Sequence, residues 1–431
     1  MVRFVSFLIF LIVVNNITLA EYGNLQLLFA VLGPAPAFVV LGLNRVIVSD
    51  IARYLGSEKY FRARKLAIDF LKTIFIMSVV MVGLLLLLKG VIDGRSDIDV
   101  APFFLPLVAL TLGQIGMNYV SSMLEAHSDF LNASILNLLE VLVRFLLLLT
   151  LFYFHFSIFS VLWVYVFSKI VPPVFYVPVL WRKINKRGIN NKMKEKNLLW
   201  ELVRQHGKWD MLRETVDKTT SNIWPFILRV FASGEAVAIY AFAQKILSFA
   251  TSLLPVKSVL FPIISSTFAK GQDEAVKIIV RSKKYLLAVY LVIVLVGLIA
   301  TGPVVEMFAR DYTPAVPFVQ IMLFHMILEV YSLGQVATFY ALKKQKYLFW
   351  IGNIIMVSRL LSEVMLIYLF GIWGLIASWF LISFTTYILR DMVLINKLNL
   401  HLWMWRSLFV FDEFDKQLLR KIRLKLNKKI V

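Results

Sequence analysis

Residues 181–209 read WRKINKRGINNKMKEKNLLWELVRQHGKW, and this stretch from Trp181 to Trp209 is the longest polar interval in the chain. Nine of its residues are lysine or arginine, and only Glu195 and Glu201 oppose them. Apolar runs of membrane-spanning length lie on both sides. Basic residues gather in the cytoplasmic connections of membrane proteins. We therefore interpret the stretch as a cytoplasmic linker between two membrane-embedded halves.

The composition predicts an all-α polytopic membrane protein. Of the 431 residues, 60% are hydrophobic and 17% are charged, whereas about half apolar is usual for soluble domains. The net charge of +20 is spread over short segments between apolar runs, which is typical of cytoplasmic loops and not of a nucleic-acid-binding face. The chain has no cysteine, which excludes disulfides and thiolate metal sites. Its five histidines are scattered, which argues against a histidine metal site.

Hydropathy predicts about twelve transmembrane helices, with ends uncertain by about 2–4 residues. The predicted spans are 3–19, 24–46, 66–89, 102–125, 130–153, 158–180, 210–231, 236–267, 284–305, 315–341, 347–369 and 372–396. Basic segments at 53–65, 181–209, 270–284 and 343–346 alternate with acidic connections, so both termini are expected to be cytoplasmic in a cell membrane. The connection with Glu125, His127 and Asp129 should also be cytoplasmic, yet it contains no lysine or arginine.

Corresponding residues in the two halves recur at an offset of about 215, among them Asn137 with Asn353 and Ala126 with Ala341. Because each half has six spans, both halves take the same orientation, and a parallel repeat is predicted. The expected organisation is a six-helix lobe (1–181), a basic linker (182–208), a second six-helix lobe (209–398) and a basic tail (399–431). The tail is interpreted as an amphipathic helix on an anionic membrane surface, or else as a solvated or partner-binding segment. Residues 1–20 are read as a first helix, with a signal peptide as the alternative.

Span seven contains a polar face, since Asp210, Arg213, Glu214, Asp217 and Ser221 recur at helical spacing. Such a face must turn away from lipid. The deeper residues Asp217, Lys218 and Asn222 are therefore candidates for lining a transport cavity, and solvation near the cytoplasm is the structural alternative. Pro225 follows, where a kink is expected.

Each half also has an arginine–glutamate pair in the middle of a span. Arg144 lies one turn after Glu140 in span five, and Arg359 lies one turn before Glu363 in span eleven. Each pair could neutralise itself and stabilise the bundle. Alternatively, both arginines face a cavity and bind an anionic group, a task that suits a guanidinium. Replacing either arginine by alanine is then expected to impair transport while leaving the protein inserted.

Three further charged or titratable residues lie within predicted spans. His325 and Glu329 in span ten could relay protons, or they could form buried hydrogen bonds. Arg45 lies near the cytoplasmic end of span two, where it could face the cavity or extend to the interface. Glu140, Glu363, Glu329, His325 and Asp217 are thus the candidates for coupling to an ion gradient. No metal site or cofactor is expected, apart from H⁺ or Na⁺ as the coupling ion.

The chain contains none of the HExxH, Walker A or GxSxG motifs, and its outer loops are short. A transporter is therefore expected and not an enzyme.

Five segments near the ends of predicted spans are Ala20-Glu-Tyr-Gly-Asn24, Gly234-Glu-Ala-Val-Ala-Ile-Tyr-Ala-Phe-Ala-Gln244, Phe261-Pro-Ile-Ile-Ser-Ser266, Phe308-Ala-Arg-Asp-Tyr-Thr-Pro-Ala-Val-Pro-Phe318 and Phe370-Gly-Ile-Trp-Gly-Leu-Ile-Ala-Ser378. They resemble motifs of the polysaccharide (Wzx-type) flippases of the multidrug/oligosaccharidyl-lipid/polysaccharide exporter superfamily. Each is degenerate, but their order and spacing cover most of the chain. The chain departs from the family pattern in its short first span and in lacking an acidic residue late in span seven, for which Asp217 is the nearest substitute.

The resemblance implies a V-shaped pair of lobes that work by alternating access. It implies export of an oligosaccharide on a polyprenyl phosphate or diphosphate to the outer leaflet. The expected partners are membrane lipid, this lipid-linked oligosaccharide and glycan-assembly proteins, with no nucleic acid and a monomeric chain.

Three alternatives remain. A drug or cation antiporter of the same superfamily would favour acidic cavity residues. A major facilitator sugar transporter should carry a motif near GxxxDRxGRR, which residues 49–56 match poorly. A membrane polysaccharide polymerase would favour larger outer loops.

Overall fold

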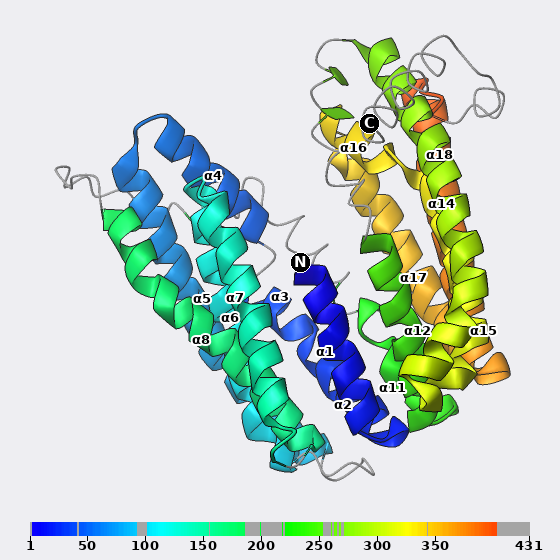
Figure 1. Ribbon diagram of the computed structural model, residues 1–431. Coiled ribbons are helices and arrows are strands. Elements are labelled where there is room, and N and C mark those ends of the chain that lie inside the picture. Colours follow the sequence, from blue (N-terminus) through cyan, green and yellow to red (C-terminus); the bar gives the residue numbers. More distant parts are fainter. Residues whose placement is uncertain are drawn as a thin grey trace, which may run out of the picture. The chain divides into compact units, whose positions relative to one another are not determined.

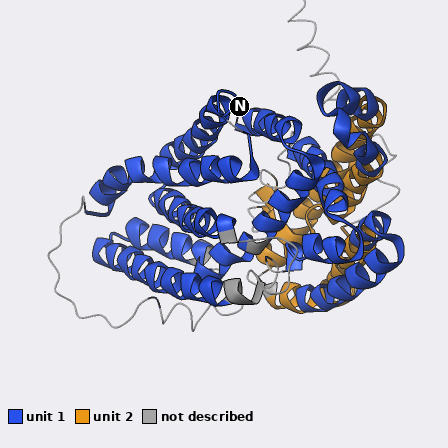
Figure 2. Cartoon of the chain, turned by 90° about the horizontal axis from the view of Figure 1, so that it is seen from below, with its two compact units in different colours: residues 1–252, 301–319, 352–379 blue, residues 253–300, 320–351, 380–431 orange. Residues whose placement is uncertain are grey.

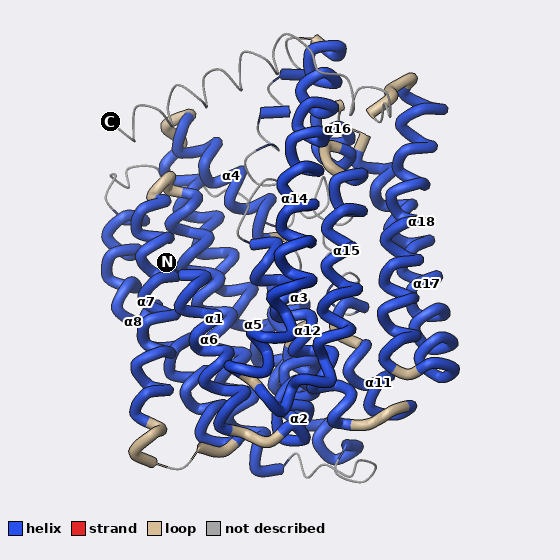
Figure 3. The backbone as a smooth tube through the Cα atoms, turned by 45° about the vertical axis from the view of Figure 1, so that its right-hand side comes forward, coloured by secondary structure: helices blue, strands red, loops and turns tan. Residues whose placement is uncertain are grey.

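The computed structural model describes residues 2–40, 43–92, 101–154, 156–185, 199, 218, 220–252, 260, 263–264, 267–268, 271–342 and 344–402. Within these residues every regular element is a helix (Figures 1 and 3). Nine helical stretches of the described chain are long and apolar enough to cross a membrane, and the shorter apolar helix α1, Val2–Asn16, precedes them. The prediction of an all-α polytopic membrane protein is confirmed.

The second predicted span, 24–46, is not one continuous helix. Helix α2, Leu19–Leu32, begins at a capping box in which the Glu21 amide donates to the Thr18 hydroxyl at 3.2 Å and the Thr18 amide donates to the Glu21 carboxylate at 2.8 Å. Helix α3, Pro34–Val40, follows after a break at Gly33. Proline has no amide proton and crowds the preceding turn, so Pro34 begins a new helix.

Residues 53–65, expected to be a connection, are largely helical. Helix α4, Asn44–Gly56, continues through Arg53, and α5, Tyr60–Ile92, begins soon afterwards. Helix α4 is amphipathic, since Ile47 and Ile51 are buried while Arg53 is exposed and pairs with Asp50 at 2.9 Å. Burial of one apolar face stabilises this helix despite its charges, and a hydropathy average over the segment does not detect that face.

Three long helices follow: α6, Ala101–Ala126, α7, Phe130–Thr150, and α8, Ile158–Asn185. Asp129 caps α7 by accepting from the Asn132 amide at 3.3 Å, and the Lys183 ammonium near the end of α8 pairs with the same carboxylate. The connection between α6 and α7 contains no lysine or arginine, and Lys183 of α8 therefore supplies the positive charge beside it. These helices share one apolar core with α4 and α5, which contains Phe70 of α5 and Met123 of α6.

Of predicted span seven (210–231), residues 210–217 and 219 lie outside the described part. Helix α11, Trp224–Phe231, begins with Pro225 in its first turn, at the position where a kink was expected. Helix α12, Gly234–Ser252, follows and contacts α2. A side chain at Gly23 of α2 would overlap the carbonyl oxygen of Gly234, so only glycine permits this close approach.

The remaining helices are α14, Gln272–Phe308, the 3₁₀ helix η2, Arg310–Ala315, α15, Val316–Ser332, α16, Gln335–Ala341, α17, Gln345–Phe370, and α18, Ile372–Leu398. Helix α14 begins twelve residues before predicted span nine, so most of the basic segment 270–284 is helical. Span ten is divided between α15 and α16, because Gly334 adopts a φ of 85°, which favours glycine.

The chain forms two compact units (Figure 2). Unit 1 comprises residues 1–252, 301–319 and 352–379, and unit 2 comprises residues 253–300, 320–351 and 380–431. Unit 1 thus includes α12 and most of α17 from the second half of the sequence. The expected division into lobes 1–181 and 209–398 crosses this grouping and stays a prediction.

In unit 2, the side chain of Lys283 lies within α14 and is buried, although the sequence placed it in a cytoplasmic loop. Its ammonium nitrogen donates to the Leu402 carbonyl at 2.8 Å. Leu400 and Leu402 belong to the core of this unit together with Ile279 and Phe339. The first residues after α18 are therefore part of the folded unit.

Candidate functional site

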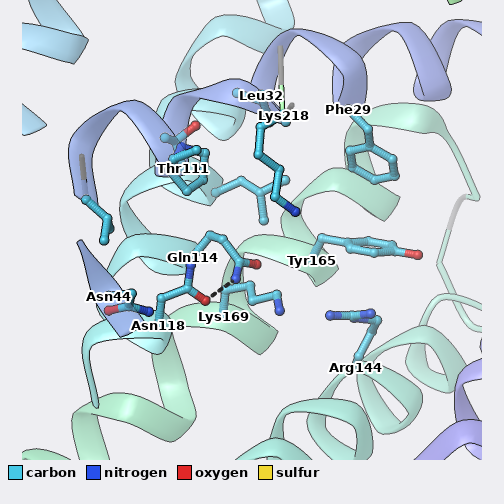
Figure 4. Close-up of a pocket in the computed structure, with 15 residues that line it drawn as sticks. Phe29, Leu32, Asn44, Thr111, Gln114, Asn118, Arg144, Tyr165, Lys169 and Lys218 are labelled. Carbon is cyan, nitrogen blue, oxygen red and sulfur yellow. Dashed lines mark hydrogen bonds between the residues drawn. The ribbon is translucent and has the colours of Figure 1, made fainter. Parts of the chain in front are cut away.

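A pocket of about 490 Å³, lined by both apolar and polar side chains, lies within unit 1 (Figure 4). Helices α2, α3, α4, α6, α7 and α8 contribute to its lining, together with Lys218. Its volume is within the range of small-molecule sites, about 300–1,000 Å³. Three basic side chains, Arg144, Lys169 and Lys218, lie in its wall.

Arg144 on α7 is held by three groups. Its guanidinium pairs with Glu140 one turn earlier, its Nε–H donates to the Ser168 hydroxyl at 3.3 Å, and its guanidinium carbon lies 4.3 Å from the centre of the Tyr165 ring. The side chain is only 13% exposed. A planar guanidinium can stack on a ring and bond at its edge simultaneously. Arg144 is therefore fixed at the pocket wall and does not move freely in solvent.

Lys169 on α8 reaches the same carboxylate. Its ammonium nitrogen lies 3.3 Å from Glu140 Oε1, and the lysine and glutamate side chains are 17% and 9% exposed. One carboxylate thus faces two cations. A buried charge needs a partner, and Glu140 supplies only one negative charge for Arg144 and Lys169 together.

Lys218 lies on the opposite wall, and Figure 4 shows its ammonium directed into the pocket. Asn222, one turn later, donates to the Lys218 carbonyl at 2.6 Å. The Asn222 side chain contacts the backbone of Gly33, a residue of the pocket lining, so closely that a Cβ at Gly33 would overlap it. Asn222 therefore borders the pocket and supports the turn on which Lys218 lies.

The pocket has a formal excess of two positive charges, because Arg144, Lys169 and Lys218 lie in its wall and Glu140, which pairs with the first two, carries the single paired countercharge among the described residues. Lys245 on α12 lies within electrostatic reach of Arg144 but does not line the pocket. In surroundings of low dielectric such an excess attracts anions strongly. The site is suited to a group with two or more negative charges, such as a phosphate or diphosphate.

The other end of the pocket is uncharged. Asn44 of α4 and Gln114 and Asn118 of α6 lie there, and the Gln114 amide nitrogen donates to Asn118 Oδ1 at 2.7 Å (Figure 4). The pocket therefore combines a basic end with an end lined by carboxamides.

The second predicted pair, Arg359 and Glu363, does not line this pocket. Both residues lie on α17, where Arg359 Nε donates to Glu363 Oε1 at 2.8 Å and the Glu363 side chain is 2% exposed. Tyr240 of α12 lies within electrostatic reach of both. Arg144 and Arg359, which the sequence placed at corresponding positions of a predicted repeat, therefore have different surroundings.

His325 and Glu329 lie on α15 in unit 2 and not in the pocket. The His325 ring is 2.8 Å from the Ser383 hydroxyl and lies edge-on to Phe380. Glu329 is within electrostatic reach of Tyr290 and Tyr387. Arg45 belongs to the first turn of α4, its side chain lies outside the described residues, and so does Asp217. Their suggested roles stay predictions.

Sequence reasoning identified Arg144, Glu140, Lys218 and Asn222, but it missed Lys169 and the carboxamides. The sequence nevertheless contains a signal that could have identified these residues. Lys169 is a charge within predicted span six, and Gln114 and Asn118 are polar residues one helical turn apart within predicted span four. Polar residues inside membrane spans mark functional sites.

Among the described residues no three acidic or histidine side chains are arranged to hold a metal ion.

Solved structures with a similar fold include membrane transporters. An inward-facing multidrug resistance MATE family transporter of the MOP superfamily is 13% identical, with a TM-score of 0.72, covering 92% of this chain and 95% of that one. The lipid II flippase MurJ in an inward closed conformation is 11% identical, with a TM-score of 0.68 and coverage of 94% and 87%. A mutant of the Vibrio cholerae MATE transporter VcmN is 16% identical, with a TM-score of 0.64 and coverage of 93% and 94%. The fold is that of MOP-superfamily transporters.

The family described as "Polysaccharide biosynthesis protein" matches residues 1–268, which is more than half of the chain. The chain therefore belongs to the polysaccharide biosynthesis protein family, and the resemblance to the polysaccharide flippases of the MOP superfamily is confirmed. No curated protein matches the chain.

Proposed function

We propose that this protein is a flippase that moves an oligosaccharide linked to a polyprenyl phosphate or diphosphate across the cell membrane, to the outer leaflet, for surface polysaccharide synthesis. The observation that carries the proposal is the basic pocket of Arg144, Lys169 and Lys218 in a membrane protein of this family. Alternating access would expose the pocket to each side in turn, with transport and not catalysis as the result.

The charge balance of the pocket supports an anionic cargo. A diphosphate ester has about two negative charges, which matches the excess of two positive charges in the pocket. Because Glu140 already pairs with Arg144 and Lys169, it is poorly placed to bind an organic cation. The pocket thus supports a flippase over a drug or cation antiporter.

Coupling to H⁺ or Na⁺ is part of the same proposal. Glu140, which pairs with two residues of the pocket wall, is suited to such a role, because protonating it would raise the positive charge around Arg144 and Lys169 and so strengthen anion binding. Glu363, Glu329, His325 and Asp217 remain further candidates. The proposed cell-membrane location, monomeric state and contact with glycan-assembly proteins follow from this function.

The test uses the purified chain in liposomes with a fluorescent polyprenyl diphosphate oligosaccharide in both leaflets. Quenching of the outer leaflet by dithionite measures how fast inner-leaflet label becomes accessible. The wild type is expected to move the label, and Arg144→Gln and Lys169→Gln are each expected to slow it about tenfold or more, the effect of about 1.4 kcal/mol. Arg182→Gln, on the same helix as Lys169 but outside the pocket and exposed, is the matched control.

A second assay distinguishes the flippase from a drug or cation antiporter. Ethidium uptake into the same liposomes is measured under an imposed proton or sodium gradient. Gradient-driven ethidium transport with a static lipid label would identify a cation antiporter and refute the flippase.

A further inference from the structure

The carboxamide end of the pocket differs chemically from the basic end and needs its own explanation. Gln114 and Asn118 lie one turn apart on α6, within a helix that is long and apolar enough to cross the membrane. Polar side chains are costly to place at such depth unless their hydrogen bonds are satisfied. Their presence on one face of α6, toward the pocket, indicates a polar ligand.

The hydrogen bonds within this cluster leave most of its capacity unused. Gln114 donates one N–H to Asn118 Oδ1 at 2.7 Å. A carboxamide has two donors and an acceptor oxygen with two lone pairs. Among the described residues these two side chains make no other hydrogen bond, so one N–H and the oxygen of Gln114 and both N–H groups of Asn118 remain available. Asn44 Oδ1 also has no partner there.

The cluster is neutral and mixed in donors and acceptors. A second phosphate would be held better by cations, and an apolar chain would leave the amides unpaired. A sugar hydroxyl is both donor and acceptor, and it matches a carboxamide. In Figure 4, Asn44 and Asn118 lie at one end of the pocket and Arg144 and Tyr165 lie at the other. Lys169 and Gln114 lie between these ends, so one ligand could reach both.

We infer that Asn44, Gln114 and Asn118 form a sugar-binding subsite, which takes the hydroxyl groups of the first pyranose while the basic end holds the diphosphate. This inference rests on the proposed function and adds a specificity site to it. The carboxamides then select glycosylated carrier over bare carrier, because a polar site rejects a ligand that leaves its groups unpaired.

The experiment measures binding to the detergent-purified full chain. The probes are farnesyl diphosphate carrying glucose, galactose or N-acetylglucosamine, and the methyl ester of farnesyl diphosphate, which has the same charge but no sugar. The wild type is expected to prefer at least one glycosylated probe over the methyl ester. Gln114→Leu, Asn118→Ala and Asn44→Ala are each expected to reduce that preference about fivefold for each hydrogen bond lost, with methyl ester affinity unchanged.

Asn137→Leu is the matched control, because Asn137 is a carboxamide on α7 that bonds to the Ala133 carbonyl at 3.0 Å outside the pocket. It should retain the full preference. The inference is overturned if the wild type prefers no glycosylated probe, or if all three variants keep the preference. It is also overturned if all three variants lose affinity for the glycosylated probe and for the methyl ester to the same extent. The amides would then bind the diphosphate or stabilise the fold, and would not recognise the sugar.

The outcomes for this subsite and for the flippase are distinguishable. Loss of sugar preference without loss of methyl ester binding supports the subsite. Binding of every probe at equal strength removes the subsite but leaves the basic end intact. Failure of the wild type to bind any probe contradicts the proposed function itself.

Discussion

The ammonium of Lys169 on α8 lies 3.3 Å from the carboxylate of Glu140 on α7. Arg144 pairs with the same carboxylate. Among the described residues, Glu140 is the only acidic side chain that pairs with the cations lining the pocket. Its charge therefore sets how strongly the basic end attracts an anion.

Replacing Glu140 by glutamine should raise anion affinity. The change keeps the shape of the side chain but increases the positive excess of the pocket by one charge. We expect the dissociation constant for the methyl ester of farnesyl diphosphate to fall about three- to tenfold, which corresponds to about 1 kcal/mol. Glu125→Gln, an exposed glutamate on α6, is the control and should leave it unchanged. Weaker binding by Glu140→Gln would show that Glu140 orients the cations more than it neutralises them.

Replacing Arg359 by alanine should impair transport without weakening anion binding. Arg359 pairs with the buried Glu363 at 2.8 Å and does not line the pocket. Loss of one partner of a buried pair costs about 3–5 kcal/mol, so α17 should be destabilised. We expect a lower thermal unfolding temperature, slower label movement and an unchanged dissociation constant for the methyl ester.

The double variant Arg359→Ala/Glu363→Gln is the companion measurement. It removes the unpaired charge, and it should recover part of the lost stability. If Arg359→Ala instead lowers anion affinity as much as Arg144→Gln does, the arginine belongs to the binding site and the separation of the two pairs is wrong.

Gly23 should not tolerate a methyl group. An alanine there would place its Cβ against the Gly234 carbonyl and force α2 from α12. Overpacking of this kind costs about 1–3 kcal/mol, to be measured as a lower unfolding temperature of the purified protein. Gly83→Ala provides the comparison, since nothing lies within 4 Å of a Cβ at Gly83 in α5. Equal unfolding temperatures for the two variants would contradict the close contact.

Acid should weaken the cap of α7. The hydrogen bond from Asn132 and the contact with Lys183 hold the pKa of Asp129 below its usual value. A depressed carboxyl pKa stabilises the fold above the unfolded value, about 3.9, and this stability is lost as pH falls through the lower folded value. Asp129→Asn keeps a capping side chain but loses the charge, so its deficit should be present at pH 7 and shrink as pH falls below the unfolded value of about 3.9.

Asp129→Ala separates the two contributions. It removes the cap as well, which costs about 0.5–2 kcal/mol, and that part should persist in acid. Burial lowers the pKa of the neighbouring His127 and the charge of Asp129 raises it. Both variants lack that charge, so His127 does not affect the difference between them. A deficit of Asp129→Asn that is independent of pH would contradict the charge effect.

Much of the fold was predictable because hydropathy reports on lipid exposure directly. The spans at 130–153, 347–369 and 372–396 correspond to α7, α17 and α18 within a few residues. The errors lie where amphipathic or broken helices depart from a uniform apolar run. Helix α4 buries only one face, α2 and α3 separate at Gly33, and α14 extends into a segment interpreted as a loop.

The candidate site was predictable only in part. Arg144 and Glu140 were found because a charge within an apolar span is conspicuous, and the helical period places them one turn apart. Sequence symmetry then suggested that Arg144 and Arg359 share a role. The structure gives Arg144 a pocket and a tyrosine face, and it gives Arg359 a buried carboxylate on its own helix.

By itself the sequence determined that the chain is a bundle of membrane-spanning helices, because backbone groups in lipid must find their hydrogen bonds within the segment. It also determined the local pairs on a single helix, since spacing along a helix fixes which side chains are neighbours. Only the tertiary structure decided that Lys169 meets Glu140 and that Gln114 and Asn118 face the same pocket as Arg144. Those relationships depend on the rotation and packing of separate helices, which no spacing within one helix specifies.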